Sequence, residues 1–189
     1  MKRMLVLVIA LLAPLVALHA ADTPKPAAQP AAPAISPTEA DVRYGDQERQ
    51  VLDFYKAKSG RPTPLLFFIH GGGWVAGDKK GVRVAPYLAT GISVVSINYR
   101  YSWQAQLAGV KPPVKAPLED AARALQFVRS KAVEWNIDKQ RIGASGGSAG
   151  ACSSLWLAFH KDMADPKSED PIARESLISP KAKATLCRT

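Results

Sequence analysis

Two mainly apolar segments, residues 65–69 and 92–99, stand out in the hydrophobic pattern of the chain. Strands without polar alternation are typical of parallel sheets that are covered on both faces. Residues 42–56 alternate loosely between apolar and polar positions, which predicts a pair of edge strands. Residues 141–145 predict one further short strand. The pattern therefore indicates a sheet whose central strands are parallel.

Helical segments separate these strands. Apolar residues recur at intervals of three and four from residue 118 to residue 136, and Pro117 predicts the start of this helix. Residues 81–90 can hold one short helix that Gly91 closes. Residues 149–160 are rich in alanine, leucine and tryptophan and predict a third helix. Strands that alternate with helices indicate a doubly wound α/β domain.

The first twenty residues have the layout of a secretory signal peptide. Lys2 and Arg3 precede an uncharged apolar run over residues 4–18, and small residues follow around Ala20. A membrane anchor is the alternative, but the apolar run is short for a membrane span and Pro14 interrupts it. We expect cleavage after Ala20, export to the periplasm or the cell exterior, and no stable membrane anchor.

A segment rich in proline and alanine follows. Residues 22–37 contain five prolines and five alanines, a composition that cannot build a core and predicts an extended tether. We therefore expect a signal peptide over residues 1–20, a linker over residues 21–40 and a folded domain over residues 41–189.

Charge, histidine and cysteine content narrow the function classes. The net charge is +9, but the basic residues are scattered and no nucleic-acid motif accompanies them, so no nucleic-acid partner is expected. The only histidines are at positions 19, 70 and 160, without ligand-spaced cysteine or carboxylate, so no metal or other cofactor is expected. Cys152 and Cys187 could pair in an exported chain. Cys152 lies four residues after Ser148, however, and we expect it to be buried against the sheet.

The candidate nucleophile lies in residues 146–150, Gly-Gly-Ser-Ala-Gly. A serine with glycine two residues before it and two residues after it suits a very sharp strand-to-helix turn, where a larger side chain would collide with neighbouring backbone. The predicted strand 141–145 and the predicted helix 149–160 provide that setting. Ser148 is therefore the predicted catalytic nucleophile.

A second glycine motif, His70-Gly71-Gly72-Gly73-Trp74, follows an apolar strand. Acyl transfer from an ester places negative charge on the carbonyl oxygen, and backbone N–H groups of a glycine-rich loop or a helix N-terminus can stabilise that charge. We expect the amides of Gly72, Gly73 and Ala149 to form this oxyanion hole. A plain turn or a phosphate-binding loop is the alternative, but Asp78 stands where a P-loop requires lysine.

The order of these motifs resembles that of the alpha/beta-hydrolase superfamily, and within it the secreted bacterial esterases similar to hormone-sensitive lipase and to acetyl-xylan and feruloyl esterases. The resemblance covers residues 44–164 and rests on these motifs: His70-Gly71-Gly72-Gly73-Trp74, Gly77-Asp78, Asn98-Tyr99-Arg100, Asp120-Ala121 and Gly146-Gly147-Ser148-Ala149-Gly150. It implies that His70, with Gly71, positions the loop and is not catalytic. Trp74 is expected to form a wall of the substrate pocket, with plain packing as the alternative.

The resemblance also implies an acid and then a histidine after the nucleophile, on loops that follow later strands. His160 lies about 18 Å from Ser148 along a helix axis and is expected to be a surface residue. The downstream acids come directly after the predicted helix: Asp162, Asp165, Glu169, Asp170 and Glu175. None is well placed as the triad acid. We therefore expect an incomplete alpha/beta-hydrolase fold, truncated on its C-terminal side after the N-terminal strands, the nucleophile elbow and the following helix.

Two classes of function follow. One is an exported carboxylic-ester hydrolase with a serine nucleophile, acting on short acyl or feruloyl esters of small molecules or polysaccharide. The other is a catalytically inactive remnant that is at most a weak carbohydrate or ester binder, and we expect this chain by itself to be inactive. An amidase similar to arylformamidase would share the nucleophile and the oxyanion geometry, and it remains an alternative.

Overall fold

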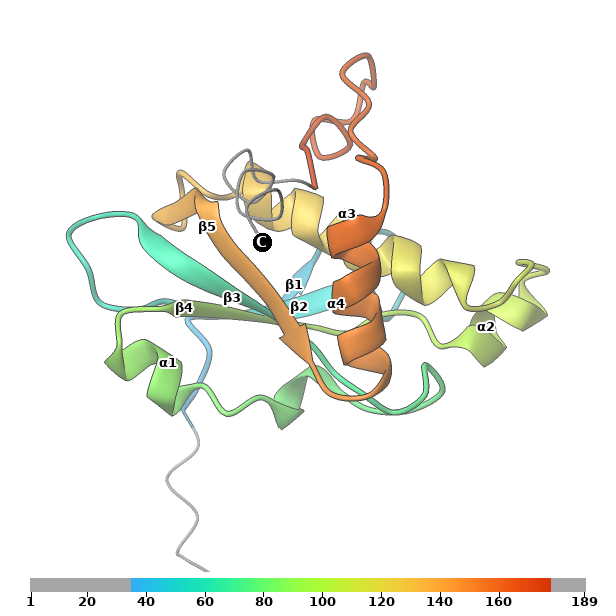
Figure 1. The fold of residues 1–189 in the computed structure, drawn as a ribbon, viewed down its shortest axis with the longest axis horizontal. Helices are drawn as coiled ribbons and strands as arrows, with labels where there is room; N and C mark the ends of the chain where they lie inside the picture. The colour runs from blue at the N-terminus through green and yellow to red at the C-terminus, as the bar shows by residue number, and fades with distance from the viewer. Residues whose placement is uncertain (1–34, 178–189) are drawn as a thin grey trace, which may run out of the picture. The chain divides into compact units, whose positions relative to one another are not determined.

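The computed structural model describes residues 35–177, which form a mixed five-stranded sheet with helices on both faces (Figure 1). The strands are β1 (Glu39–Arg43), β2 (Val51–Tyr55), β3 (Thr63–Ile69), β4 (Ser93–Ile97) and β5 (Ile137–Gly146). Their spatial order is β1-β2-β4-β3-β5. β3 pairs in parallel with β4 and β5, and β2 pairs antiparallel with β1 and β4. The predicted α/β architecture with parallel central strands is confirmed.

The helices are η1 (Lys79–Gly81), α1 (Ala85–Ala89), α2 (Ser102–Leu107), α3 (Lys115–Ser130) and α4 (Ala149–Phe159). Successive residues of a strand face opposite sides of a sheet, and the core divides accordingly. Val95 packs in the large cluster with Val128 of α3 and Leu157 of α4, whereas Val94 packs in a small cluster with Val84 and Leu88 at α1. Burial on both faces explains why β4 has no charged residue: all of its residues are buried, and the hydroxyls of its two serines are hydrogen-bonded.

Two predicted elements have wrong boundaries. The long helix starts at Lys115, not at residue 118, and ends at Ser130, not at residue 136. Pro117 fits inside its first turn because the first amides of a helix have no intrahelical acceptor. β5 starts at Ile137, four residues before the predicted strand, because Ile137 pairs with Thr63 of β3; the register is then irregular, and regular pairing resumes between Leu65 and Ile142.

The N-terminal hairpin forms as predicted, but only β1 lies at the edge of the sheet, since β2 pairs with both β1 and β4. β1 begins at Glu39, so the last two residues of the expected 21–40 linker belong to this strand. The expected signal peptide and most of the expected linker lie outside the described residues. No helix within residues 35–177 is long and apolar enough to cross a membrane.

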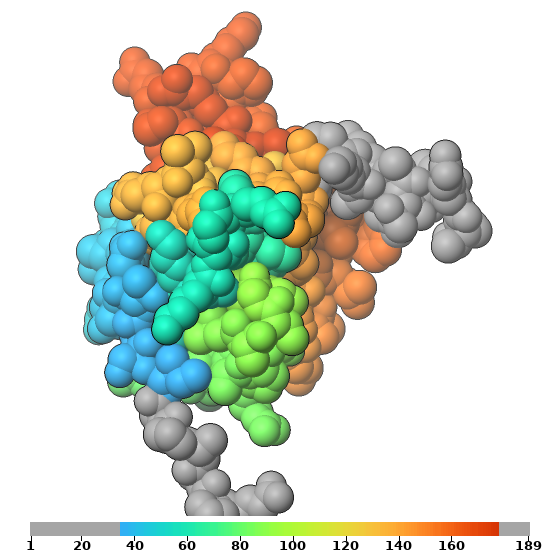
Figure 2. Space-filling view, turned by 90° about the vertical axis from the view of Figure 1, so that its left-hand side faces the viewer, coloured from blue at the N-terminus to red at the C-terminus, as the bar shows by residue number. Residues whose placement is uncertain are grey.

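β5 is the other edge of the sheet. Gly143, Ala144 and Ser145 are exposed, and no strand in the described part of the chain pairs with the outer side of β5. Residues 161–177 contain no helix or strand; Figure 2 shows them (red-orange) above residues near 130–140. Gln126 of α3 donates to the carbonyl of Glu175 at 2.9 Å, so α3 holds this segment in place.

Candidate active site

Ser148 is the N-cap of α4 and has backbone angles of φ 52° and ψ −120°. This is a sparsely populated conformation for a residue with a side chain, and such residues cluster at functional sites. The residue is exposed to solvent. The predicted strand–turn–helix setting is confirmed, because β5 ends at Gly146 and α4 begins at Ala149.

The two flanking glycines of the elbow contact the end of β3. A Cβ atom on Gly146 would lie 2.2 Å from the carbonyl oxygen of Ile69, and one on Gly150 would lie 2.0 Å from the same oxygen. Both distances are far below van der Waals contact. A Cβ atom on Gly147, by contrast, would have no such neighbour within 4 Å. The elbow therefore requires glycine at positions 146 and 150, on either side of the serine, but not at position 147.

The loop of residues 70–77, called loop 70–77 below, lies beside this elbow. β3 and β5 are parallel neighbours, with Ile69 opposite Gly146, so both motifs emerge at the same edge of the sheet. A Cβ on Gly71 would lie 2.7 Å from the carbonyl oxygen of Gly147 and 3.7 Å from the Cβ of Ser148. The fold thus brings together the two motifs that are far apart in sequence.

Three backbone amides predicted as oxyanion donors are available near Ser148. Loop 70–77 turns through hydrogen bonds from the amides of Val75 and Ala76 to the carbonyl of Gly72. In residues 35–177, the amides of Gly72 and Gly73 donate to no protein acceptor. Ala149 occupies the first turn of α4, where amides have no intrahelical acceptor and the helix dipole favours negative charge. No acceptor in residues 35–177 occupies the Gly72 and Gly73 amides, and their oxyanion-hole role with Ala149 stays a prediction.

His70 is buried and faces the loop's own backbone. Its Nδ1 lies 2.7 Å from the carbonyl of Gly71, and because a carbonyl can only accept, Nδ1 carries the proton. The ring stacks on Tyr99 with centroids 4.2 Å apart. Burial lowers the pKa of His70, outweighing the hydrogen bond to Gly71. His70 makes no hydrogen bond to Ser148, which agrees with a loop-positioning role and not with that of a base.

Trp74 connects loop 70–77 to helix α4. Its indole Nε1 donates to Oγ of Ser153 at 3.0 Å, and Ser153 is buried on the first turns of α4. The Trp74 carbonyl accepts from the amide of Ser102 at 2.7 Å. The residue is half-buried against the core. Trp74 thus links the loop to α4 through a hydrogen bond. Its role as a wall of the substrate pocket stays a prediction.

The motif Asn98-Tyr99-Arg100 directly follows β4, and the sequence alone gave it no role. In the structure, Tyr99 of this motif holds the start of loop 70–77. The hydroxyl of Tyr99 donates to the carbonyl of His70 at 2.9 Å and is 3.3 Å from that of Gly71. Arg100 forms a close ion pair with buried Asp120. The sequence signal was the order of Asn98-Tyr99-Arg100 and Asp120 along the chain, which gave no indication of these contacts.

A buried lysine holds the segment that follows the loop. Nζ of Lys79 lies 2.7 Å from Asp53 of β2 and 2.9 Å from Asp41 of β1. The amide of Lys79 donates to the side chain of Asn98, which in turn donates to Asp78. None of these supports was predicted, because a lysine in a polar segment gives no sign of burial.

The prediction that Cys152 is buried against the sheet is wrong. Cys152 is exposed and its thiol is free; Cys187 lies outside the described residues. The buried face of α4 consists of Ala149, Gly150, Ser153 and Leu157. Ser148 is the N-cap and not a helical residue, so a four-residue offset from it does not identify a helix face. Cys152 instead lies on the outer side with Leu155 and Phe159.

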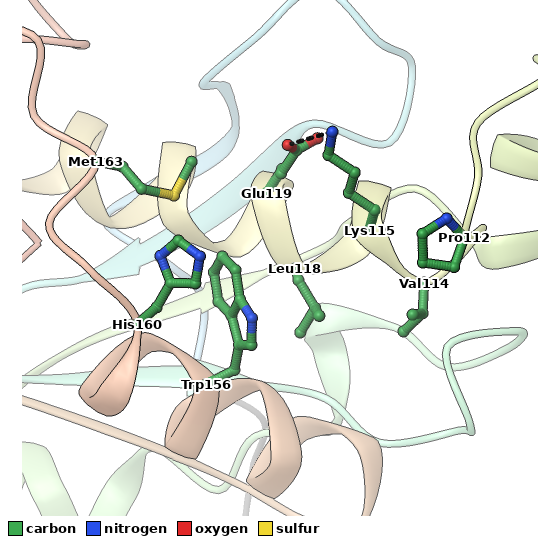
Figure 3. Close-up of a pocket in the computed structure, with 8 residues that line it drawn as sticks. All are labelled: Pro112, Val114, Lys115, Leu118, Glu119, Trp156, His160 and Met163. Carbon is green, nitrogen blue, oxygen red and sulfur yellow. Dashed lines mark ion pairs between the residues drawn. The ribbon is translucent and has the colours of Figure 1, made fainter.

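His160 lies at the opposite end of α4 from Ser148, as predicted. It is the C-cap of the helix, is exposed, and its ring lies at a tilt against that of Trp156, with ring centroids 4.1 Å apart. Figure 3 shows both rings in a cavity of about 290 Å³ that also involves Leu118 and Met163. The cavity belongs to the far end of α4 and is not the candidate site.

The downstream acids are also engaged elsewhere. Asp170 pairs with Arg123 of α3, and Glu175 lies 2.7 Å from Nζ of Lys139. Asp162 accepts from the amide of Leu177 at 2.9 Å. In residues 35–177 no carboxylate–imidazole pair hydrogen-bonds to Ser148, so the described site contains the predicted nucleophile and the predicted amide donors without a general base.

Comparison with known proteins gives a consistent result. The versiconal hemiacetal acetate esterase of Dothistroma septosporum is 32% identical over 152 residues, which cover 76% of this chain and 42% of that protein. The acetyl ester-xyloside bifunctional hydrolase of Caldicellulosiruptor lactoaceticus matches with a TM-score of 0.61 at 28% identity, over 77% of this chain and 56% of that one. Thermogutta terrifontis esterase 2, phosphorylated by paraoxon, gives a TM-score of 0.59 at 26% identity, over 72% and 53%.

The chain therefore spans about half the length, or less, of these proteins. The resemblance to alpha/beta-hydrolase esterases that the motifs indicated is confirmed. The BD-FAE family model matches residues 52–183, a range that contains both glycine motifs. On this match, together with the shared fold, the chain belongs to the BD-FAE family of alpha/beta-hydrolases.

Proposed function

We propose that this protein is a carboxylic-ester hydrolase that acts by acyl transfer to Ser148. The observation that carries the proposal is the placement of an exposed serine, in a strained N-cap conformation, beside the Gly71 backbone of loop 70–77. A nucleophile next to unoccupied amide donors is the arrangement that acyl transfer requires.

In this mechanism, Oγ of Ser148 attacks the ester carbonyl and loses its proton to a base. The amides of Gly72, Gly73 and Ala149 stabilise the resulting oxyanion, and the alcohol leaves with a proton to form the acyl-enzyme. Water then releases the acid by the reverse proton transfers. Loss of one oxyanion donor costs about 100- to 1000-fold in turnover.

The substrates that we propose are short acyl or feruloyl esters, including esters of polysaccharide. The names of the matched proteins, an acetate esterase and an acetyl ester-xyloside hydrolase, support acetyl esters first. The layout of residues 1–20 supports action outside the cytoplasm. Trp74, which is half-buried within loop 70–77, is the proposed pocket wall.

The experiment measures p-nitrophenyl acetate hydrolysis by two proteins, each with a Ser148→Ala control. The first is the full chain. The second is a chimera in which the C-terminal part of the Caldicellulosiruptor lactoaceticus hydrolase follows residue 177. We expect turnover above the control in the chimera alone, because no imidazole of residues 35–177 reaches Ser148.

A folded chimera that is no faster than its Ser148→Ala variant would overturn the proposal. Ser148-dependent turnover by the full chain would instead contradict the expectation that this chain is inactive. In that case His70 or His160 would have to act as the general base. Comparing acetate, butyrate and ferulate esters, and acetylated xylo-oligosaccharides, would define the acyl and alcohol preferences.

A further inference from the structure

We propose that Arg49, on the turn between β1 and β2, is a positioning residue for loop 70–77 and its oxyanion donors. The inference rests on the proposed function, since the loop has a catalytic task only if Ser148 is a nucleophile. Arg49 makes no contact with Ser148; it donates to the main chain at the end of the loop and reaches the start of the loop through Tyr99.

The guanidinium of Arg49 reaches the end of the loop directly. Its Nη2 donates to the carbonyl of Gly77 at 3.2 Å. Gly77 itself closes the loop on its own start, because a Cβ there would lie 2.4 Å from Nδ1 of His70 and 2.6 Å from the carbonyl of Gly71. Holding Gly77 therefore fixes the backbone at both the first and the last residues of the loop.

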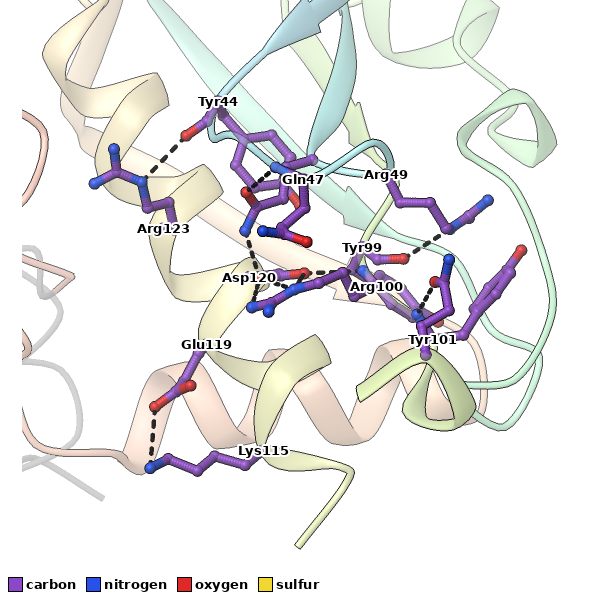
Figure 4. A network of polar contacts seen from close by, with 12 residues as sticks. Tyr44, Gln47, Arg49, Tyr99, Arg100, Tyr101, Lys115, Glu119, Asp120 and Arg123 are labelled. Atoms are coloured by element: carbon purple, nitrogen blue, oxygen red, sulfur yellow. Dashed lines mark hydrogen bonds and ion pairs between the residues drawn. The ribbon is translucent and has the colours of Figure 1, made fainter. Parts of the chain in front are cut away.

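The same guanidinium also reaches the residue that holds the start of the loop. Nε of Arg49 donates to the carbonyl of Tyr99 at 2.8 Å (Figure 4). The hydroxyl of Tyr99 in turn donates to the carbonyl of His70 at 2.9 Å, and the Tyr99 ring stacks on His70. One side chain from the N-terminal hairpin thus ties together two segments that enclose the loop.

A third contact fixes the guanidinium plane. The Cζ atom of Arg49 lies 3.8 Å from the ring centroid of Tyr101, and the Tyr101 hydroxyl donates to the same Gly77 carbonyl. A planar, forked cation can stack and donate in two directions at once, whereas a lysine ammonium is a point charge on a flexible stem. The site therefore requires arginine.

Such external support matters because loop 70–77 cannot fix itself. Gly71, Gly72 and Gly73 have no side chains to pack, and the hydrogen bonds within the loop are the two main-chain bonds to the Gly72 carbonyl and the one from the His70 ring to the Gly71 carbonyl. Oxyanion stabilisation depends on amides held in place before the reaction, and a displacement of about 1 Å can cost about 100-fold in rate.

Arg43 provides a matched control on the same hairpin. It is also an arginine that donates to main-chain carbonyls, those of Asp46 and Gln47. It makes no contact with loop 70–77. Arg43→Gln and Arg49→Gln therefore remove similar groups from the hairpin, and only the second removes the contacts to Gly77 and Tyr99.

The test measures amide hydrogen exchange of the full chain by mass spectrometry. We expect Arg49→Gln to accelerate exchange in peptides covering residues 71–77 by at least about tenfold, because hydrogen bonds from a charged donor are lost. Peptides from β3 and α3 should keep their wild-type rates, and Arg43→Gln should leave the loop unchanged. Arg49→Lys should give a smaller acceleration confined to the same peptides.

Unchanged loop exchange in Arg49→Gln, or equal acceleration in Arg43→Gln, would overturn the inference. Acceleration spread evenly over β3 and α3 would also overturn it, because Arg49 would then stabilise the whole domain. If Arg49→Gln does not fold, Arg49→Lys decides, and wild-type exchange in its loop peptides would be the contradicting result.

Kinetics of the chimera separate this inference from the proposed function. Arg49→Gln should lower kcat by about 10- to 100-fold and change KM by less than about threefold, as expected for an effect realised in the transition state. Suppose that Arg49→Gln accelerates amide hydrogen exchange in the loop peptides, but the chimera has no Ser148-dependent turnover. This result would refute the proposed function and leave the positioning role intact. Wild-type kcat in Arg49→Gln would refute the positioning role alone.

Discussion

The two glycine-rich segments of the site are stabilised in different ways. The elbow at residues 146–150 fits by shape, because Gly146 and Gly150 pack directly on the carbonyl of Ile69. Loop 70–77 is held by polar side chains from other elements, including Arg49, Tyr99 and the Lys79 group that follows it. The elbow should therefore respond to changes of volume, whereas the loop, which is also closely packed at Gly77, should respond in addition to changes of charge and hydrogen bonding.

The elbow gives the largest expected effect. In Gly150→Ala, the new methyl group would lie 2.0 Å from the Ile69 carbonyl, and we expect a loss of about 3 kcal/mol or more in the free energy of unfolding. Gly147→Ala, with open space at this position, should change it by less than about 1 kcal/mol. Urea unfolding measures both. Equal effects would show that the elbow is not held by close packing.

The buried lysine next to the loop gives a similar but smaller effect. Lys79→Met leaves Asp53 buried without its cation, which should cost about 3 kcal/mol. Lys80→Met removes an exposed neighbour and should be close to neutral. A Lys79→Met variant as stable as wild type in urea would contradict the assignment of Lys79 as a support of the loop.

The stabilisation by Lys79 should also depend on pH at the alkaline end. Burial lowers the pKa of Lys79, but the hydrogen bonds to Asp53 and Asp41 raise it more, so the net shift is upward from 10.5. A raised folded-state pKa gives stability that is complete below 10.5 and is lost as the pH rises through the folded-state value. The stability gap between wild type and Lys79→Met should therefore be constant from neutral pH to about pH 10 and shrink above it.

Exposed apolar side chains on the outer side of α4 predict that the protein self-associates. Leu155 and Phe159 are 59% and 73% exposed on α4, near the open edge of β5, and such surfaces favour aggregation. Leu155→Glu with Phe159→Glu should weaken association at least about tenfold, equivalent to about 1.4 kcal/mol. Val133→Glu, at a residue 92% exposed elsewhere, should not. Sedimentation of residues 21–189 measures this, and a monomeric, soluble, cooperatively melting wild type would refute it.

The hydrogen bond between Trp74 of loop 70–77 and Ser153 of α4 gives the smallest expected change in the free energy of unfolding. Trp74→Phe and Ser153→Ala each remove the hydrogen bond from the indole to the Ser153 hydroxyl, so each should cost about 1 kcal/mol. The double variant should cost less than the sum of the two, with a coupling of about 0.5–1 kcal/mol. Additive effects in urea unfolding would mean that this hydrogen bond does not connect the loop to α4.

The sequence predicted the elements whose cause is local. The apolar runs of β3 and β4 required burial on both faces, and glycines at either side of Ser148 required a sharp turn. The two glycine motifs identified the candidate nucleophile and amide donors because both depend on the absence of side chains at fixed positions. These features need no knowledge of distant residues; the structure has the strands and the sharp turn at Ser148 where they were predicted, and the roles of Ser148 and the amide donors stay predictions.

Only the tertiary structure decided which residues support the site and which helix face is buried. Nothing near Arg49 or Lys79 in the sequence indicates their contacts, because their partners at Gly77, Tyr99 and Asp53 are brought together by strand pairing. Helix α4 is apolar on most sides, so its periodicity did not reveal that Cys152 faces outward. Long-range polar contacts and the choice between similar helix faces depend on the packed neighbours, and those exist only once the sheet has formed.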